Sequence, residues 1–179
     1  TPDEFRELIR MLVERVPNLD SAEIEDVITG VGMPEGCQGM NMSRIAAMAA
    51  GFPKEVAATS VNRFCSSGSQ AIMMAAHAIL HEGAEVAIGA GVETITMMQD
   101  GTQNTTRMVN KTAQARFPGL YFPMGVTAEV VAERYKVSRE DQDRYALQSQ
   151  QRYAAAAAKG WIAEEIAAMK TRRKVQPKD

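Results

Sequence analysis

The stretch VNRFCSSGSQA, residues 61–71, contains Cys65, one of two cysteines in the chain, in a setting suited to thiol chemistry. A β-prone run ends just before Cys65, and very small residues that indicate the start of a helix follow it. The free N–H groups and the dipole of a helix N-terminus favour the thiolate, which is the nucleophilic form. An acyl group on the sulfur would find room there, and the Cys65 N–H can face a developing oxyanion. The alternative is a small buried hydrophobe at a strand end, the commoner role of a lone cysteine.

A cysteine nucleophile needs a base, and the sequence offers only His77 and His81. Both fall on the helix that Cys65 opens, and the distance from Cys65 to His77 along a helix is about 18 Å at 1.5 Å per residue. We therefore expect that neither histidine reaches the thiol and that the base of a catalytic Cys65 lies outside this chain. The two histidines lack the Glu of H-E-x-x-H and a third ligand, so we predict no metal site. Cys37 is expected to be structural.

The overall composition excludes several classes of protein. A formal net charge of -2 provides no general attraction for nucleic acid or anionic membranes. Two cysteines are too few for a disulfide framework, and no apolar run approaches the ~20 residues that span a bilayer. With 45% hydrophobic residues the chain can bury a core. We expect a soluble cytoplasmic protein that binds neither nucleic acid nor membrane.

The first half of the chain alternates between helical and β-prone segments, which is typical of an α/β fold with a largely parallel sheet. A helix is expected from the start of the chain, with Thr1 as its cap and Pro2 in its first turn. The strand at 86–91 is expected to be buried on both faces. We predict strands at 24–32, 56–64 and 86–91, and further helices at 43–50 and 65–81.

The composition of the sequence changes after Met98, and the hydrophobic periodicity is lost. An irregular stretch rich in Gly, Asn, Thr and Pro is followed by predicted helices at 127–135 and 138–159, the second with Ser138 as N-cap and Gly160 as its stop. The basic run from Lys170 to Lys174 is expected to be a solvated charged segment. We predict two domains, an α/β core at 1–98 and a mainly helical domain at 99–179.

The Gly89-Ala90-Gly91 sequence after the third predicted strand is not a dinucleotide-binding motif, because the third glycine is missing and no convincing helix follows. Four segments, however, are more specific: VNRFCSSGSQA (61–71), GAGVETIT (89–96), PMGVTAEVVAERY (123–135) and SREDQDRYALQSQQRYAAAAAKG (138–160). Together they resemble the thiolase family of acyl-CoA acyltransferases, and they occur in the order found there. A ketoacyl synthase shares a cysteine at a helix start, but the VNRFCSSG and MGVTAE runs fit thiolases better.

The resemblance implies a thiolase-like N-terminal α/β domain, with a mixed, mostly parallel sheet and helices on both faces, plus a loop domain that covers the active site. It implies that Cys65 takes the acyl group from 3-ketoacyl-CoA, or from acetyl-CoA in condensation, and that its N–H forms half of an oxyanion hole. By the same resemblance Met124 borders the acyl pocket, while Gly91 and Glu93 lie in a turn behind the nucleophile, among the residues that contact coenzyme A. Coenzyme A and acyl-CoA are then substrates, with no permanently bound cofactor, and the strand at 56–64 pairs across a homodimer or tetramer.

The chain also departs from the family pattern. The family's first strand is absent before Thr1, and its C-terminal half, with the activating histidine and a second catalytic cysteine, is missing after Asp179. Ser69 stands where the family usually has Leu or Met. We therefore expect the N-terminal half of a thiolase, inactive alone, with a mitochondrial or peroxisomal location if the source is eukaryotic. The alternative is a catalytically silent fragment that acts as a binding or assembly module, or an incomplete gene product.

Overall fold

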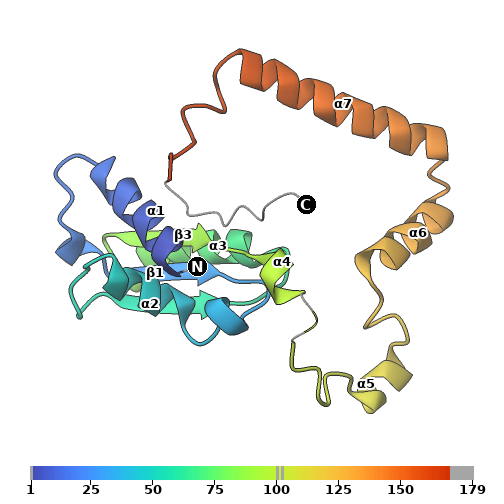
Figure 1. The fold of residues 1–179 in the computed structure, drawn as a ribbon, viewed down its shortest axis with the longest axis horizontal. Helices are drawn as coiled ribbons and strands as arrows, with labels where there is room; N and C mark the ends of the chain where they lie inside the picture. The colour runs from blue at the N-terminus through green and yellow to red at the C-terminus, as the bar shows by residue number, and fades with distance from the viewer. Residues whose placement is uncertain (1, 100, 102, 170–179) are drawn as a thin grey trace, which may run out of the picture. The chain divides into compact units, whose positions relative to one another are not determined.

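The computed structural model describes residues 2–99, 101 and 103–169, and the chain divides into two compact units. Of the described residues, one unit comprises those up to 103 together with 167–169, and the other comprises residues 104–166. The expected cap at Thr1 and the basic run from Lys170 to Lys174 lie outside the described residues. Figure 1 shows the elements of both units.

The first unit is built on a three-stranded sheet in which both strand pairs are parallel. The strands are β1 (Asp26–Gly30), β2 (Ala57–Val61) and β3 (Ala87–Gly91). Their order is β2-β1-β3, so β1 lies between the other two. Gly30 pairs in register with Val61 on one side and with Gly91 on the other, so the carboxyl ends of the strands share one edge. The predicted α/β class with a parallel sheet is confirmed.

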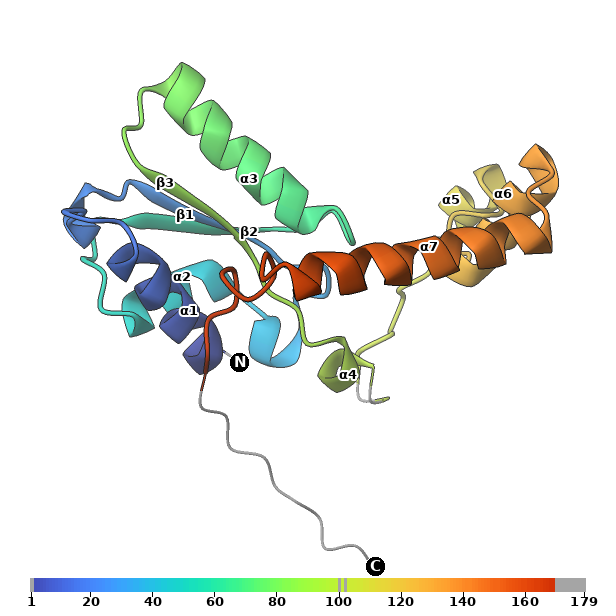
Figure 2. The ribbon, with the colours of Figure 1, turned by 90° about the horizontal axis from the view of Figure 1, so that it is seen from above.

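Helices cover both faces of this sheet, as the sequence predicts. They are α1 (Pro2–Glu14), α2 (Met42–Ala49) and α3 (Ser67–His77). Figure 2 shows α1 and α2 on one side of the sheet and α3 on the other. The α2 N-terminus is capped by Asn41, whose Oδ1 accepts a hydrogen bond from the Arg44 N–H at 3.0 Å. The main core lies on the side of α1 and α2.

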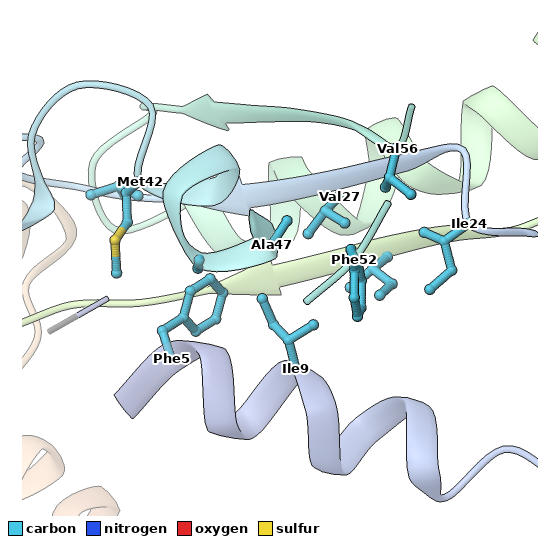
Figure 3. Packing of buried hydrophobic residues seen from close by; sticks show 11 residues of the cluster. Phe5, Ile9, Ile24, Val27, Met42, Ala47, Phe52 and Val56 are labelled. Atoms are coloured by element: carbon cyan, nitrogen blue, oxygen red, sulfur yellow. The ribbon is translucent and has the colours of Figure 1, made fainter. Parts of the chain in front are cut away.

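The main core joins α1 and α2 to β1. Phe5 and Ile9, one helical turn apart on α1, point toward the sheet, where Val27 of β1 and Ala47 of α2 meet them (Figure 3). All four side chains are buried, and full burial of a Val, Ile or Phe side chain contributes about 1.5–3 kcal/mol. These two side chains, four residues apart on one face of the helix, therefore hold α1 against the sheet.

The opposite face has a smaller core, because α3 alone covers it. Ile28 of β1 packs there with Ala71 and Ala75 of α3. The expectation that strand 86–91 is buried on both faces is wrong, since Ile88 is its one fully buried residue. Apolar side chains on α3 and the turn after it stay exposed: Ile72, Met73, Ile79 and Leu80.

Two predicted elements around Cys65 are shorter in the structure. The strand predicted at 56–64 ends at Val61, because the chain then leaves the ladder and Phe64 adopts a left-handed backbone with φ 46°. The helix predicted at 65–81 runs from Ser67 to His77, continues as a π turn over Ala78–Glu82 and stops at a left-handed Gly83. Cys65 therefore lies between the strand and the helix.

Within the first unit, a further short helix, α4 (Ile95–Met98), follows β3. The second unit contains three helices: α5 (Lys111–Arg116), α6 (Met124–Tyr135) and α7 (Arg139–Ala158). The predicted cap of α7 is confirmed, because Ser138 accepts from the Asp141 N–H, and Gly160 with φ 78° follows its end. No residue of 104–166 is fully buried. Among the described residues, no helix is both long and apolar enough to cross a membrane.

Candidate active site

A pocket of about 490 Å³ lies at the carboxyl edge of the sheet in the first unit. Most of its lining residues end or follow the strands, and the others belong to α3 or lie at or near α4. They are Gly30, Gly32 and Met33 at β1, Phe64, Cys65, Ser67 and Gly68 after β2, and Gly91, Val92, Glu93, Ile95 and Gln99 at β3 and beyond. Ligands of parallel α/β sheets bind at this edge, because loops and helix N-termini converge there. The structure thus brings Cys65, Gly91 and Glu93 to one pocket.

A tight turn presents Cys65 to the pocket. Asn62 Oδ1 accepts from the Phe64 N–H at 2.8 Å, and the Ser66 N–H donates to the Arg63 carbonyl at 3.1 Å. Phe64 is left-handed in this turn, a conformation that costs a bulky residue about 1–2 kcal/mol. Cys65 carries a free, exposed thiol, so it is not the buried hydrophobe of the alternative interpretation.

The helix start predicted next to Cys65 lies slightly further along the chain. The first residue of α3 is Ser67, and Ser66 occupies the N-cap position without a side-chain capping hydrogen bond. Cys65 is thus the residue directly before the N-cap. The amides and dipole of the α3 N-terminus are close enough in sequence to favour an anion near the sulfur.

The α3 N-terminus sits directly on the end of β1. A Cβ on Gly30 would lie 2.2 Å from the Ser67 carbonyl carbon and 2.4 Å from the Gly68 nitrogen. Real Cβ atoms essentially never come within 3.0 Å of another heavy atom, so only glycine allows this approach. The Cys65 turn can therefore lie this close to the sheet only because residue 30 of β1 is a glycine.

The Glu93 carboxylate joins the segments that follow β1 and β3. Its Oε2 accepts from the Gly32 N–H at 2.8 Å, and its Oε1 accepts from the Gln38 side-chain amide at 2.6 Å. Gln38 is fully buried and also donates to the Met33 carbonyl at 3.0 Å. Both Glu93 oxygens are engaged by the protein, so this carboxylate ties one wall of the pocket together.

Neither histidine lines the pocket. His77 is the last residue of α3, about 15 Å of helix from Ser67 at 1.5 Å per residue, and its ring lies 5.7 Å from that of His81. No group of three metal-ligating side chains occurs among the described residues. The pocket therefore contains an exposed thiol, and no histidine lines it.

The remaining residues singled out in the sequence lie elsewhere. Met124 is the exposed first residue of α6 in the second unit, so its role stays a prediction. Cys37 is half-buried in the short helical turn Gly36–Gln38. Sequence reasoning missed Gln38, because no local pattern pairs it with Glu93 fifty-five positions later. The only signal was a polar residue in a glycine-rich loop.

Comparison with known proteins identifies relatives along nearly the whole chain. The family model "Thiolase, N-terminal domain" matches residues 4–178. The chain is 41% identical to 3-ketoacyl-CoA thiolase 2, peroxisomal, of Arabidopsis thaliana, covering 99% of this chain and 38% of the relative. It is 42% identical to the β-ketoadipyl-CoA thiolase of Acinetobacter baylyi, covering 88% of this chain and 43% of the relative.

The crystal structure of the Bacillus anthracis acetyl-CoA acetyltransferase has a similar fold. It superposes with a TM-score of 0.75 at 31% sequence identity, covering 97% of this chain and 47% of that one. The chain thus spans less than half the length of each of these relatives. On the family match and the shared fold, this chain belongs to the thiolase family and corresponds to its N-terminal domain.

Proposed function

We propose that Cys65 is the nucleophile of acyl transfer between acyl-CoA thioesters and coenzyme A. In thiolysis the sulfur attacks the C3 carbonyl of a 3-ketoacyl-CoA and the C2–C3 bond breaks. The released acetyl-CoA carbanion takes up a proton, and the acyl group stays on Cys65 as a thioester until the thiol of coenzyme A accepts it. In condensation, acetyl-CoA supplies the acyl group. The observation that carries the proposal is the exposed Cys65 thiol beside a helix start, in a pocket at the carboxyl edge of the sheet.

Other groups are assigned supporting roles in this proposal. The Cys65 N–H is assigned to donate to the oxyanion of the tetrahedral intermediate. This amide is chosen because the amides of Phe64 and Ser66 on either side of it already donate to other atoms of the turn. Gly91 and Glu93 form the pocket wall toward coenzyme A. The resemblance to thiolases assigns Met124 to the border of the acyl pocket. Coenzyme A and its thioesters are substrates in this scheme.

The proton acceptor for Cys65 is proposed to come from polypeptide outside these 179 residues. His77 and His81 are absent from the pocket lining, and both oxygens of Glu93 are engaged. The relatives are more than twice as long, and the exposed apolar side of α3 offers a surface for further polypeptide. A homodimer or tetramer through β2, which lies at the edge of the sheet, is part of the same proposal.

Intact-mass spectrometry after incubation with acetyl-CoA tests the proposal. The chain should gain one acetyl group slowly, since the helix start favours the thiolate but does not replace a base. Cys65→Ala should abolish the adduct, while the matched variant Cys37→Ala should keep it. Absence of an adduct, alone and with a C-terminal thiolase half added, would refute the assignment of Cys65. Thiolytic turnover by the isolated chain would refute the external base.

The second candidate function is a catalytically silent binding or assembly module. The exposed apolar residues of α3 and the absence of fully buried residues in 104–166 favour a chain that packs against other polypeptide. The same experiment separates the two, because a silent module forms no acetyl adduct with or without a C-terminal half.

A further inference from the structure

We propose that Ser67 is a positioning residue whose hydroxyl holds the turn that presents Cys65. This inference rests on the proposed role of Cys65 as the acyl acceptor. The Ser67 hydroxyl oxygen accepts from the Arg63 N–H at 2.9 Å and donates to the Phe64 carbonyl at 2.6 Å. Ser67 is 3% exposed, whereas Cys65 on the same turn is exposed. One buried hydroxyl therefore bridges the two residues directly before the nucleophile.

The turn needs such a bridge because of the backbone of Phe64. Its φ of 46° lies in the left-handed region, which bulky side chains avoid. The Phe64 side chain is 76% exposed, so little packing holds the residue in place. A strained backbone conformation persists only where its surroundings impose it. The hydrogen bond from the Ser67 hydroxyl to the Phe64 carbonyl acts on the strained residue itself.

Ser67 also connects the turn to the rigid sheet. Its carbonyl carbon lies 2.2 Å from the point that a Cβ on Gly30 would occupy, so the Ser67 backbone has no room to move toward β1. The Ser67 N–H also donates to the Phe64 carbonyl at 3.0 Å, and this backbone hydrogen bond does not depend on the hydroxyl. Loss of the hydroxyl keeps both of these contacts but removes the only acceptor described for the Arg63 N–H and one of the two donors to the Phe64 carbonyl, so the segment that carries the sulfur is held less firmly. The expected consequence is a misplaced Cys65 in an otherwise folded chain.

Three variants of the 179-residue chain test this role: Ser67→Ala, the conservative Ser67→Thr, and the control Ser69→Ala. Ser69 is an exposed residue of the same helix turn and does not line the pocket. Acetylation of Cys65 is followed by peptide mass mapping over a range of acetyl-CoA concentrations, and alkylation by iodoacetamide is measured in parallel. Thermal unfolding is recorded for every variant.

Ser67→Ala should lower the maximal acetylation rate and the alkylation rate by about ten-fold or more, within the ~100-fold that a 1 Å misplacement can cost. Ser67 itself lines the pocket, but Gly91 and Glu93, which are assigned to the wall toward coenzyme A, are unchanged, so the acetyl-CoA concentration for half-maximal rate should stay within about two-fold. Ser67→Thr should restore the rate, and Ser69→Ala should match the wild type. Wild-type rates in Ser67→Ala, or an equal loss in Ser69→Ala or in folded Ser67→Thr, would overturn the proposal.

This experiment distinguishes failure of the proposed acyl-transfer function of Cys65 from failure of the proposed positioning role of Ser67. If the wild type is alkylated but never acetylated, the acyl-transfer function fails while the effect of Ser67→Ala on alkylation still decides the positioning role. If Ser67→Ala does not fold, amide exchange of the wild type decides instead. The Arg63 N–H, bonded to the Ser67 hydroxyl, should then exchange at least about ten-fold more slowly than an unstructured amide. An unprotected Arg63 amide would overturn the proposal.

Discussion

Gly30→Ala tests whether the close approach of α3 to the sheet places Cys65. The new Cβ would lie 2.2 Å from the Ser67 carbonyl carbon, and ordinary contact begins at 3.4 Å, so the α3 N-terminus must retreat by about 1.2 Å. Both nearest atoms belong to the helix backbone, which moves only with the helix. The retreat therefore carries the turn that holds Cys65 away from the strand end.

Overpacking of this kind costs about 1–3 kcal/mol, and the smaller unfolded-state entropy of alanine returns about 0.4–1 kcal/mol. We expect net destabilisation of about 1–2 kcal/mol, which lowers the Tm of a unit of this size by at least about 4 °C. Because about 1 Å of misplacement can cost ~100-fold in rate, Cys65 acetylation should slow by about ten-fold or more.

The assay combines thermal unfolding with mass-spectrometric acetylation of Cys65. Gly91→Ala is the matched control for stability, because Gly91 pairs in register with Gly30 and its added Cβ would lie 3.5 Å from the Gly68 Cα, an ordinary contact. That control should unfold within about 0.5 kcal/mol of the wild type. Wild-type stability and acetylation in Gly30→Ala would refute the reasoning.

Three further predictions concern single side chains. Glu93→Gln replaces one of two accepting oxygens by a donor, so urea unfolding should show a loss of about 1–3 kcal/mol, and an unchanged midpoint would contradict the clamp to Gly32 and Gln38. Asn41→Ala removes the α2 cap and a hydrogen bond to the Ala58 carbonyl, so urea unfolding should show a loss of about 1–3 kcal/mol in the free energy of unfolding. A loss below about 0.5 kcal/mol would contradict the role of Asn41 as a cap. Burial, and then the charge of Glu82, raises the pKa of Asp26 above its ordinary 3.8, although a hydrogen bond from the Val27 backbone opposes this. Ionised Asp26 is therefore unfavourable in the folded state above the raised pKa, so Asp26→Asn should stabilise the protein near pH 7, and this gain should vanish as the pH falls below 3.8. Equal gains at both pH values would contradict that assignment.

Local patterns in the sequence were sufficient to predict most of the elements of the first unit and to single out Cys65, whose role as a nucleophile stays a prediction. Pro2 near the start of the chain predicted a helix there, which is α1, and Ser138 and Gly160 marked the limits of α7. The alternation of strands and helices predicted the parallel sheet, and the small residues after Cys65 predicted a helix start within two residues of the observed one. These signals work because periodicity and capping act between residues a few positions apart.

Only the tertiary structure showed how the pocket is held together. Glu93 meets Gln38 across fifty-five positions, and Gly30 meets Ser67 because strand register places the end of β1 under the α3 N-terminus. The left-handed Phe64 that shortens β2 is also invisible in propensities, which assign such a backbone to glycine. Local spacing therefore determined most of the elements and the place of Cys65 beside a helix start. Contacts between distant residues determined its setting, because they depend on register and close packing, which no short stretch of sequence encodes.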